Sequence, residues 1–248
     1  NPNIETGSED RFIYGIDGRR ILERGSPVNS FYGVEVAGIF QSQEEIDSAP
    51  DHSFLNPNFG PGDLRFVDQN NDGVINQEDR TLIGKEDPTW LFGANINMSY
   101  KNLDLSVIIS GAADFDSYST AEIARPFFSN ASLEKRWVNR WTPTNTETNI
   151  PRLFFTDGPA TSINNAFWIL DRSYVRLKNV QLGYTLPTSM LDKTFISKCR
   201  VYLSGSNLIT WTKFPYFDPE RPKSNTEDRG QDGFPNLSVV AVGLNLSF

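Results

Sequence analysis

The sequence has no long apolar run. Its most apolar stretch, residues 103–113, is interrupted by Asp104, Ser106 and Ser110, whereas a membrane-spanning helix needs about 20 consecutive apolar residues. Hydrophobic residues make up only 38% of the 248 residues, although aromatic residues reach 12%. A helical membrane protein is therefore excluded, and the apolar side chains must be used in shorter elements.

Residue types that carry catalysis or redox chemistry are scarce. There is one cysteine, Cys199, which cannot form an internal disulfide and is predicted to be a small buried or half-buried hydrophobe. The single histidine, His52, lies beside Pro50 and Asp51, and we interpret it as a solvated surface imidazole rather than a general base. The chain also lacks a nucleophile elbow, a Cys/His pair and a Gly-rich phosphate loop. The sequence therefore predicts no enzyme.

Two further absences narrow the class of protein. The formal net charge is -8 and no block of Lys and Arg occurs, so nucleic acid is not an expected partner. The chain opens with Asn-Pro-Asn, without Met, a basic segment or an apolar segment. We therefore expect an export signal to lie upstream, in a longer protein.

The pattern that is present is strict alternation of apolar and polar residues, which indicates strands with one apolar face. It predicts strands at residues 31–40, 92–100, 103–109, 174–186, 200–211 and 240–248. In the fourth of these the apolar phase shifts between Leu177 and Val180, which predicts a β-bulge near Lys178 or Asn179.

The connections between these strands alternate in length. Those at residues 41–87, 112–171 and 212–236 are long, whereas 101–102 is minimal and 187–198 is short. Long loops at one end and short turns at the other are typical of outer-membrane β-barrels, whose strands are apolar outside and polar inside. An antiparallel sandwich shares the alternation, because one face of each sheet packs on a core. The pattern favours the barrel and places the C-terminus at the short-turn, periplasmic end.

Seven stretches of the sequence are more specific than the alternation. They are FYGVEVAGIFQSQEEID (31–47), PGDLRFVDQNNDGVINQEDRTLIG (61–84), RWTP (140–143), SYVRLKNVQLGYTLP (173–187), RVYLSGSNLITWTKF (200–214), FDPE (217–220) and VGLNLSF (242–248). These stretches resemble the C-terminal region of the SusC/RagA family of TonB-linked outer-membrane proteins. The likeness runs in order from about Gly25 to the end, and residues before Gly25 match less clearly.

The resemblance implies an all-β fold, an antiparallel transmembrane β-barrel of 22 strands of which residues 1–248 supply about the last six. It implies import of glycans or peptides across the outer membrane of Bacteroidota, with energy from TonB through an upstream plug and with a SusD-like surface lipoprotein as lid. The long loops would then be extracellular and the barrel would contact outer-membrane lipid.

The segment DQNNDGVINQED matches the spacing of a 12-residue calcium loop. The predicted ligands are Asp68, Asn70, Asp72, Val74 through its carbonyl, Asn76 and Asp79. Gly73 allows the sharp turn on which the oxygen ligands converge. Asp79 stands where such loops carry a bidentate Glu, so a bound Ca²⁺ would be held more weakly there. A polar turn that only mimics the motif is the alternative.

Aromatic and polar side chains allow further expectations under the barrel interpretation. Trp211 and Phe214 fit an interfacial aromatic girdle, whereas Trp137 and Trp141 lie in a long loop and are predicted to be buried within its fold. The expected lumen-facing residues include Asn95, Asn97, Asn245 and Ser247. No residue can be assigned to a substrate from sequence.

Two other functions remain open at this point. The first keeps the barrel but changes the cargo to a siderophore or vitamin, without a lid lipoprotein. The second is a soluble, calcium-dependent carbohydrate-binding β-sandwich. The resemblance favours the glycan or peptide importer over both.

Overall fold

The computed structural model describes residues 11–15, 18–119, 126–127, 132–154, 158–192, 194–215, 218–220 and 236–248. The chain divides into two compact units, which we call the loop unit (residues 1–87, 115–170 and 222–232) and the sheet unit (88–114, 171–221 and 233–248). In the described residues, strands dominate and the single α-helix is the short α1 (Gln43–Asp47). None of the helices in these residues has the length and apolar character needed to cross a bilayer.

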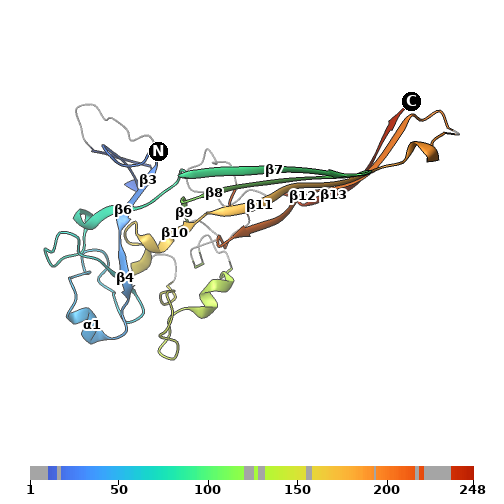
Figure 1. Ribbon diagram of the computed structural model, residues 1–248. Coiled ribbons are helices and arrows are strands. Elements are labelled where there is room, and N and C mark those ends of the chain that lie inside the picture. The colour runs from blue at the N-terminus through green and yellow to red at the C-terminus, as the bar shows by residue number, and fades with distance from the viewer. Residues whose placement is uncertain are drawn as a thin grey trace. The chain divides into compact units, whose positions relative to one another are not determined.

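Five long strands lie side by side in the sheet unit (Figure 1). They are β7 (Trp90–Tyr100), β8 (Leu103–Ala113), β11 (Tyr174–Thr185), β12 (Lys198–Thr212) and β13 (Val239–Ser247). Their order is β13-β12-β11-β8-β7, and each neighbouring pair is antiparallel. The strands predicted from residue 92 onward are thus confirmed. All five have at least the roughly 9 residues that a tilted strand needs to cross a bilayer.

The two faces of this sheet differ in chemistry, because residues paired across strands share a face. One row that crosses all five strands consists of Met98, Leu105, Leu182, Leu203 and Val242. The adjacent row, on the opposite face, consists of Asn97, Ser106, Gln181, Ser204 and Ala241. We call these the apolar face and the polar face.

The apolar face is exposed. Met98, Leu182, Leu203 and Val242 each leave between 48% and 77% of their surface accessible. A sandwich would seal such side chains under a second sheet, so their exposure favours the barrel interpretation. Cys199 is buried, as predicted, and is a free thiol.

The predicted bulge is confirmed in β11. Leu177 pairs with Ile109 of β8 and Asn179 pairs with the preceding Ile108, so Lys178 is an extra residue without a partner in that ladder. The extra residue restores the phase of the strand, because Leu177 and Val180 both face the apolar side. One inserted residue therefore keeps the apolar face continuous.

The outer strands of the sheet are open among the described residues. β7 pairs with β8 on one side and β13 pairs with β12 on one side, and neither has a second partner there. Every residue of β7 is exposed. An edge strand of 11 residues presents a long row of unpaired backbone groups, which natural sheets avoid by pairing or covering.

The loop unit is built from short strands. They are β1 (Arg11–Tyr14), β2 (Arg20–Glu23), β3 (Ser30–Val34), β4 (Val36–Ile39), β5 (Leu64–Phe66), β6 (Arg80–Lys85), β9 (Asp116–Tyr118) and β10 (Ile169–Asp171). They form a four-stranded sheet, β1-β2-β3-β6, and the pairs β4-β5 and β9-β10. Five 3-10 turns complete the described part of the chain: Gln77–Asp79, Lys135–Asn139, Pro159–Thr161 and Ala166–Trp168, and, in the sheet unit, Thr188–Met190.

The prediction that residues 31–40 form a strand of the long sheet is wrong. Residues 31–40 form β3 and β4, which belong to two different small sheets, and all five residues of β3 are buried. Glu35, between the two strands, is exposed, so the alternation across residues 31–40 does not mark the two faces of one long strand. The described sheet consequently has five strands, and the total of 22 in a complete barrel stays a prediction.

The loop unit has its own aromatic core. Trp137 and Trp168 are almost completely buried, and Phe167 lies 4.8 Å from the Trp168 ring and 6.2 Å from the Trp137 ring between centroids. Trp141 is buried as well, and its indole N–H donates to Gln41 at 2.8 Å. The predicted burial of Trp137 and Trp141 is confirmed.

An ion pair with a buried carboxylate and an exposed guanidinium joins two of the long connections. Arg152 donates through Nε and Nη2 to the two carboxylate oxygens of Asp63, each at 2.7 Å, and Gly60 N–H adds a third bond at 2.8 Å. Burial raises the pKa of Asp63 against the opposing effect of these donors. Residues 41–87 and 115–170 are therefore parts of one loop unit where they are described.

Candidate functional site

The predicted calcium loop forms a tight turn closed by its own side chains. Asp68 Oδ2 accepts from Gly73 N–H at 2.9 Å, Asn70 Oδ1 from Asp72 N–H at 3.0 Å, and Asp72 Oδ1 from Val74 N–H at 2.8 Å. Gly73 takes a φ of +84°, which a side chain would strain. The first three predicted ligands therefore lie on one turn.

The second half of the loop is closed differently. Asn76 accepts from Glu78 N–H at 2.7 Å. The two oxygens of Asp79 accept from Gln69 N–H and Asn76 N–H, both at 2.8 Å, and Asp79 is fully buried. Asp79 thus ties the end of the loop to its beginning, a role that the sequence motif did not predict.

One oxygen in the loop has no hydrogen-bond partner. Asp68 Oδ1 is buried and unsatisfied. Among the described residues, no three His, Cys, Asp or Glu side chains are grouped so that they could hold a metal ion. The predicted set would therefore depend on the amide oxygens of Asn70 and Asn76 and on the Val74 carbonyl as well as on its carboxylates.

The interpretation of His52 as a surface residue is wrong. Only 4% of His52 is exposed, and its ring lies among those of Phe40, Phe59 and Phe66 at 5.0 to 5.8 Å between centroids. Nδ1 lies 2.6 Å from the Pro50 carbonyl, and Nε2 accepts from Phe66 N–H at 3.1 Å. Burial lowers the pKa of His52. A neutral imidazole with both nitrogens used by the backbone is a structural group.

The residues predicted to face a lumen share the polar face. Asn97 is paired with Ser106, Asn245 with Arg200 and Ser247 with Lys198. Asn97 Nδ2 also donates to Asn95 Oδ1 at 3.1 Å, along the same face of β7. The alternation in the sequence was sufficient to identify this face.

A charged pair at the short-turn end of the polar face was not predicted. Arg200 donates through Nε to Asp104 at 2.9 Å and through Nη2 to the other oxygen of the same carboxylate. The Arg200 side chain passes over Gly183, where an added Cβ would lie 2.4 Å from its guanidinium. Asp104 and Arg200 are 96 positions apart, so no local spacing reveals this pair.

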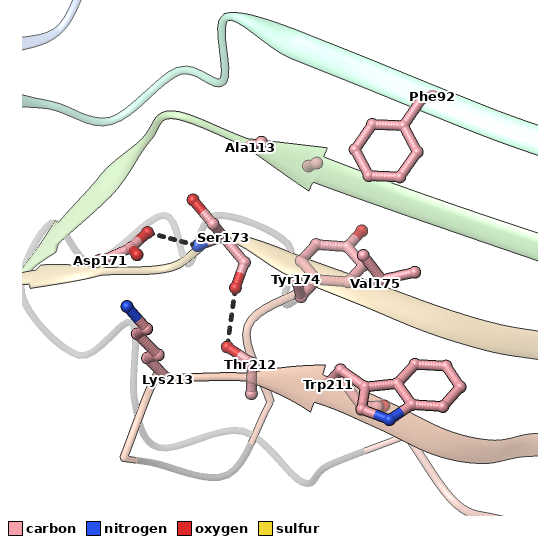
Figure 2. A pocket seen from close by; sticks show the side chains of 11 residues that line it. Phe92, Ala113, Asp171, Ser173, Tyr174, Val175, Trp211, Thr212 and Lys213 are labelled. Carbon is pink, nitrogen blue, oxygen red and sulfur yellow. Dashed lines mark hydrogen bonds between the residues drawn. The ribbon is translucent and has the colours of Figure 1, made fainter.

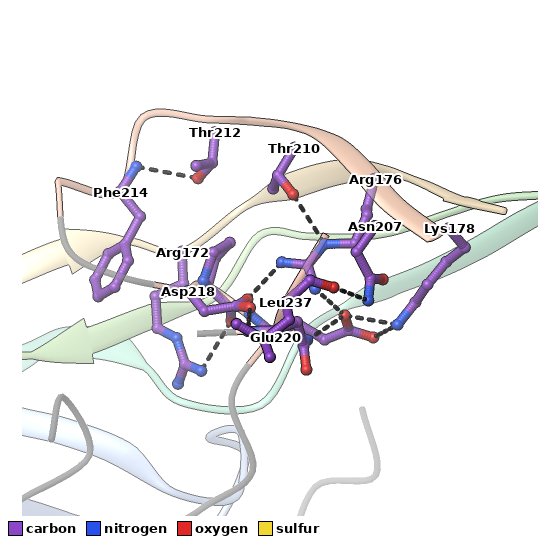
Figure 3. A network of polar contacts seen from close by, with 12 residues as sticks. Arg172, Arg176, Lys178, Asn207, Thr210, Thr212, Phe214, Asp218, Glu220 and Leu237 are labelled. Atoms are coloured by element: carbon purple, nitrogen blue, oxygen red, sulfur yellow. Dashed lines mark hydrogen bonds and ion pairs between the residues drawn. The ribbon is translucent and has the colours of Figure 1, made fainter. Parts of the chain in front are cut away.

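A larger charged cluster lies at the long-loop end of the polar face (Figure 3). Arg176 and Lys178 of β11 contact Asp218 and Glu220 of the connection between β12 and β13. Arg176 Nε also donates to Thr210 Oγ1 of β12 at 2.9 Å. We call Arg176, Lys178, Asp218 and Glu220 the ion cluster. From the sequence, residues 217–220 (FDPE) were noted only as part of the family resemblance, and the ion cluster was not predicted.

The same end of the sheet carries a shallow hollow of about 510 Å³ (Figure 2). Its walls include Phe92, Tyr174, Val175 and Trp211. Trp211 is 54% exposed, as expected of a girdle residue, but Phe214 is 8% exposed and is not one. A shallow depression between aromatic side chains can take an apolar chain.

Comparison with curated proteins finds TonB-dependent receptors along almost the whole chain. The chain is 34% identical over 241 residues to TonB-dependent receptor P3 of Formosa agariphila, and this match covers 92% of the chain. It is 33% identical over 233 residues to TonB-dependent receptor P26 of the same organism, and this match covers 90% of the chain. It is 27% identical over 195 residues to TonB-dependent receptor SusC of Bacteroides thetaiotaomicron, over 76% of its length. The chain spans 23% of the length of P3 and of P26 and 18% of SusC.

Solved structures give the same result for the fold. The RagAB peptide importer in its open-open state matches 99% of the chain with a TM-score of 0.73 and 25% identity. The match uses 25% of that protein's chain. The closed-closed state of the same importer matches 98% of the chain with a TM-score of 0.72. No model of a protein family matches the sequence.

Proposed function

The chain is a segment of a SusC/RagA-like TonB-dependent receptor, and from this premise we propose that the whole protein imports glycans or peptides across the bacterial outer membrane. In this function the polar face lines a lumen and the apolar face contacts lipid. The relatives are receptors and transporters, not enzymes. In the proposed function this chain forms part of the wall and of the loops.

The observation that carries the proposal is the two-sided sheet with open edges. Its rows are apolar on one face and polar on the other across five strands. In a bilayer, a backbone group without a partner costs several kcal/mol, so a sheet spans a membrane only when it closes into a barrel. Further strands of the same protein would pair with β7 and β13.

We also propose the partners that such a receptor needs. A SusD-like surface lipoprotein would cover the end of the barrel that bears the long connections, and TonB would act from the opposite side through a plug outside this chain. The support is the likeness to SusC and to the RagAB importer. Transport of a siderophore or vitamin without a lid is the alternative, and a soluble sandwich is disfavoured by the exposed apolar face.

The test is uptake by cells that carry the full-length receptor. Two labelled probe pools are supplied, a maltooligosaccharide ladder and a tryptic peptide mixture, to wild-type, receptor-deleted and TonB-deleted strains. We expect uptake of one pool that needs both the receptor and TonB. Uptake of ferric siderophore or cobalamin instead of both pools would favour the alternative, and no TonB-dependent uptake of any probe would refute import.

We further propose that the loop from Asp68 to Asp79 binds Ca²⁺ and thereby stiffens the loop unit. The turn geometry of Asp68, Asn70 and Asp72 supports this, and so does the unsatisfied buried oxygen of Asp68. Because the Asp79 carboxylate is engaged by backbone N–H groups, binding would be weak, in the range of extracellular calcium modules.

A further inference from the structure

The connection between β12 and β13 is held at both of its described legs. Asp218 lies at the centre: its Oδ1 accepts from Glu220 N–H on the first leg, and its Oδ2 accepts from Asn236 N–H on the second, both at 2.9 Å. Asn207 of β12 donates to Leu237 O at 3.2 Å, and Ser238 donates back to Asn207 O at 2.7 Å. The two legs are thus tied to each other and to the sheet (Figure 3).

We propose that the ion cluster is a staple that holds residues 218–220 against the polar face of the sheet, so that this leg forms a fixed part of the wall past which cargo moves. The assignment of that face to a lumen rests on the proposed function. The staple itself rests only on contacts within the sheet unit.

The geometry of the cluster is that of a strong ionic contact. Arg176 Nη2 lies 2.5 Å from Asp218 Oδ1, and Arg176 Nη1 lies 2.7 Å from Glu220 Oε2. Lys178 Nζ adds contacts to both Glu220 oxygens at 2.5 and 2.7 Å. Two cations thus meet two anions, and ionised donors and acceptors give the stronger class of hydrogen bond.

Burial makes the contact obligatory for the central pair. The Arg176 and Asp218 side chains are each 3% exposed, and a buried charge without its partner is strongly unfavourable. Burial would raise the pKa of Asp218, but the hydrogen bonds from Arg176 and from the Asn236 and Glu220 N–H groups outweigh it and lower the pKa. The carboxylate therefore stays charged, and the leg stays docked near neutral pH.

The bulge in β11 lies at the ion cluster. Lys178 is the inserted residue, and it reaches Glu220 on the side to which Arg176 points. Asn179 follows on the polar face and donates to Ser206 Oγ at 3.2 Å. A bulge commonly re-aims a side chain at a particular target, and here it adds a second cation without interrupting the apolar face.

Variants of the outer pair test the staple in the full-length receptor. Lys178 keeps 32% of its side chain exposed, whereas Glu220 also contacts the buried Arg176, so charge reversal is made only at Lys178. We compare Lys178→Glu, the conservative Lys178→Arg and Glu220→Gln, with Lys213→Glu as a matched control on the same connection, where Lys213 is exposed.

Hydrogen exchange of the peptides that contain the Glu220 and Asn236 amides is the first measurement. We expect Lys178→Glu and Glu220→Gln to speed hydrogen exchange by about tenfold or more, Lys178→Arg to stay within about threefold of wild type, and the control to leave it unchanged. Unchanged hydrogen exchange in both Lys178→Glu and Glu220→Gln would overturn the staple, whether or not the receptor transports anything.

Uptake of the probe pool that the wild type imports is the second measurement. Slower uptake in Lys178→Glu and Glu220→Gln with wild-type uptake in Lys178→Arg supports a fixed part of the passage. Faster hydrogen exchange with wild-type uptake in Lys178→Glu and Glu220→Gln would overturn that role and leave the staple as a local support. A wild-type receptor that imports neither pool would refute the proposed function, while the hydrogen-exchange result would still decide the staple.

Discussion

At the residue scale, His52 shows that the neighbours of a residue in the sequence do not reveal whether its side chain is buried. Its neighbours in the chain are Pro50, Asp51 and Ser53, which indicate a solvated turn. The ring is nevertheless enclosed by Phe40, Phe59 and Phe66. Burial of a polar ring depends on partners that come together only in the folded loop unit, so local composition gave the opposite prediction.

The burial of His52 predicts a pH-dependent loop unit. Because burial lowers its pKa in the folded state, the unfolded state binds more protons below the ordinary histidine pKa of about 6.5. Stability is therefore complete above that pH and is lost as pH falls through the window below it. Thermal unfolding of the full receptor, followed between pH 7.5 and 5.5 by loop-unit peptides in mass spectrometry, measures this loss.

The variant His52→Gln provides the control for this prediction. Glutamine cannot be protonated in this range and keeps an acceptor near the position of Nε2. We expect it to destabilise the loop unit by about 1–2 kcal/mol through lost ring contacts, with a flatter dependence on pH than wild type. Equal slopes in the two proteins would show that other groups cause the pH dependence.

At the element scale, the sequence was reliable where a strand has two different environments. Residues 92–100 and 240–248 alternate cleanly because one face of each strand is apolar and the other polar, and both strands are found. The bulge could be predicted for the same reason, since Leu177 and Val180 must both lie on the apolar face. Residues 31–40 gave a wrong prediction because they form two strands, β3 and β4, in two different small sheets, and only β3 is buried along its whole length.

The calcium loop yields a prediction at the same scale. Isothermal titration of the full receptor with CaCl₂ is expected to show binding in the range of about 10⁻⁴ to 10⁻³ M. Asp68→Ala removes the oxygen that lacks a partner and should abolish the binding, whereas Asp47→Ala, at the end of α1, should leave it unchanged. Absence of heat in wild type, or equal binding by the Asp68 variant, would contradict a site in this loop.

At the scale of the whole molecule, the sequence predicted how loops and strands are distributed but not how the loops fold. The long connections at residues 41–87 and 112–171 were visible as interruptions of the alternation. Their joining by Asp63 and Arg152, 89 positions apart, and the ion cluster with its separation of 42 positions depend on long-range pairing. Such pairs leave no periodic signal in a single sequence.

The assignment of the two faces predicts opposite effects for neighbouring residues of β12. Leu203 lies on the apolar face and Ser204 on the polar face, in the rows that cross the middle of the sheet. If the apolar face meets lipid, Leu203→Arg should destabilise the receptor by about 2–4 kcal/mol near the bilayer midplane, whereas Ser204→Arg, facing water, should change stability little. Denaturant unfolding in lipid bilayers, with the folded fraction read from heat-modified gel mobility, compares the two variants. Because the substituted side chain is identical and the positions are adjacent, only the face differs. Equal tolerance of both variants, or greater damage from Ser204→Arg, would mean that lipid does not lie on the side that the alternation marks.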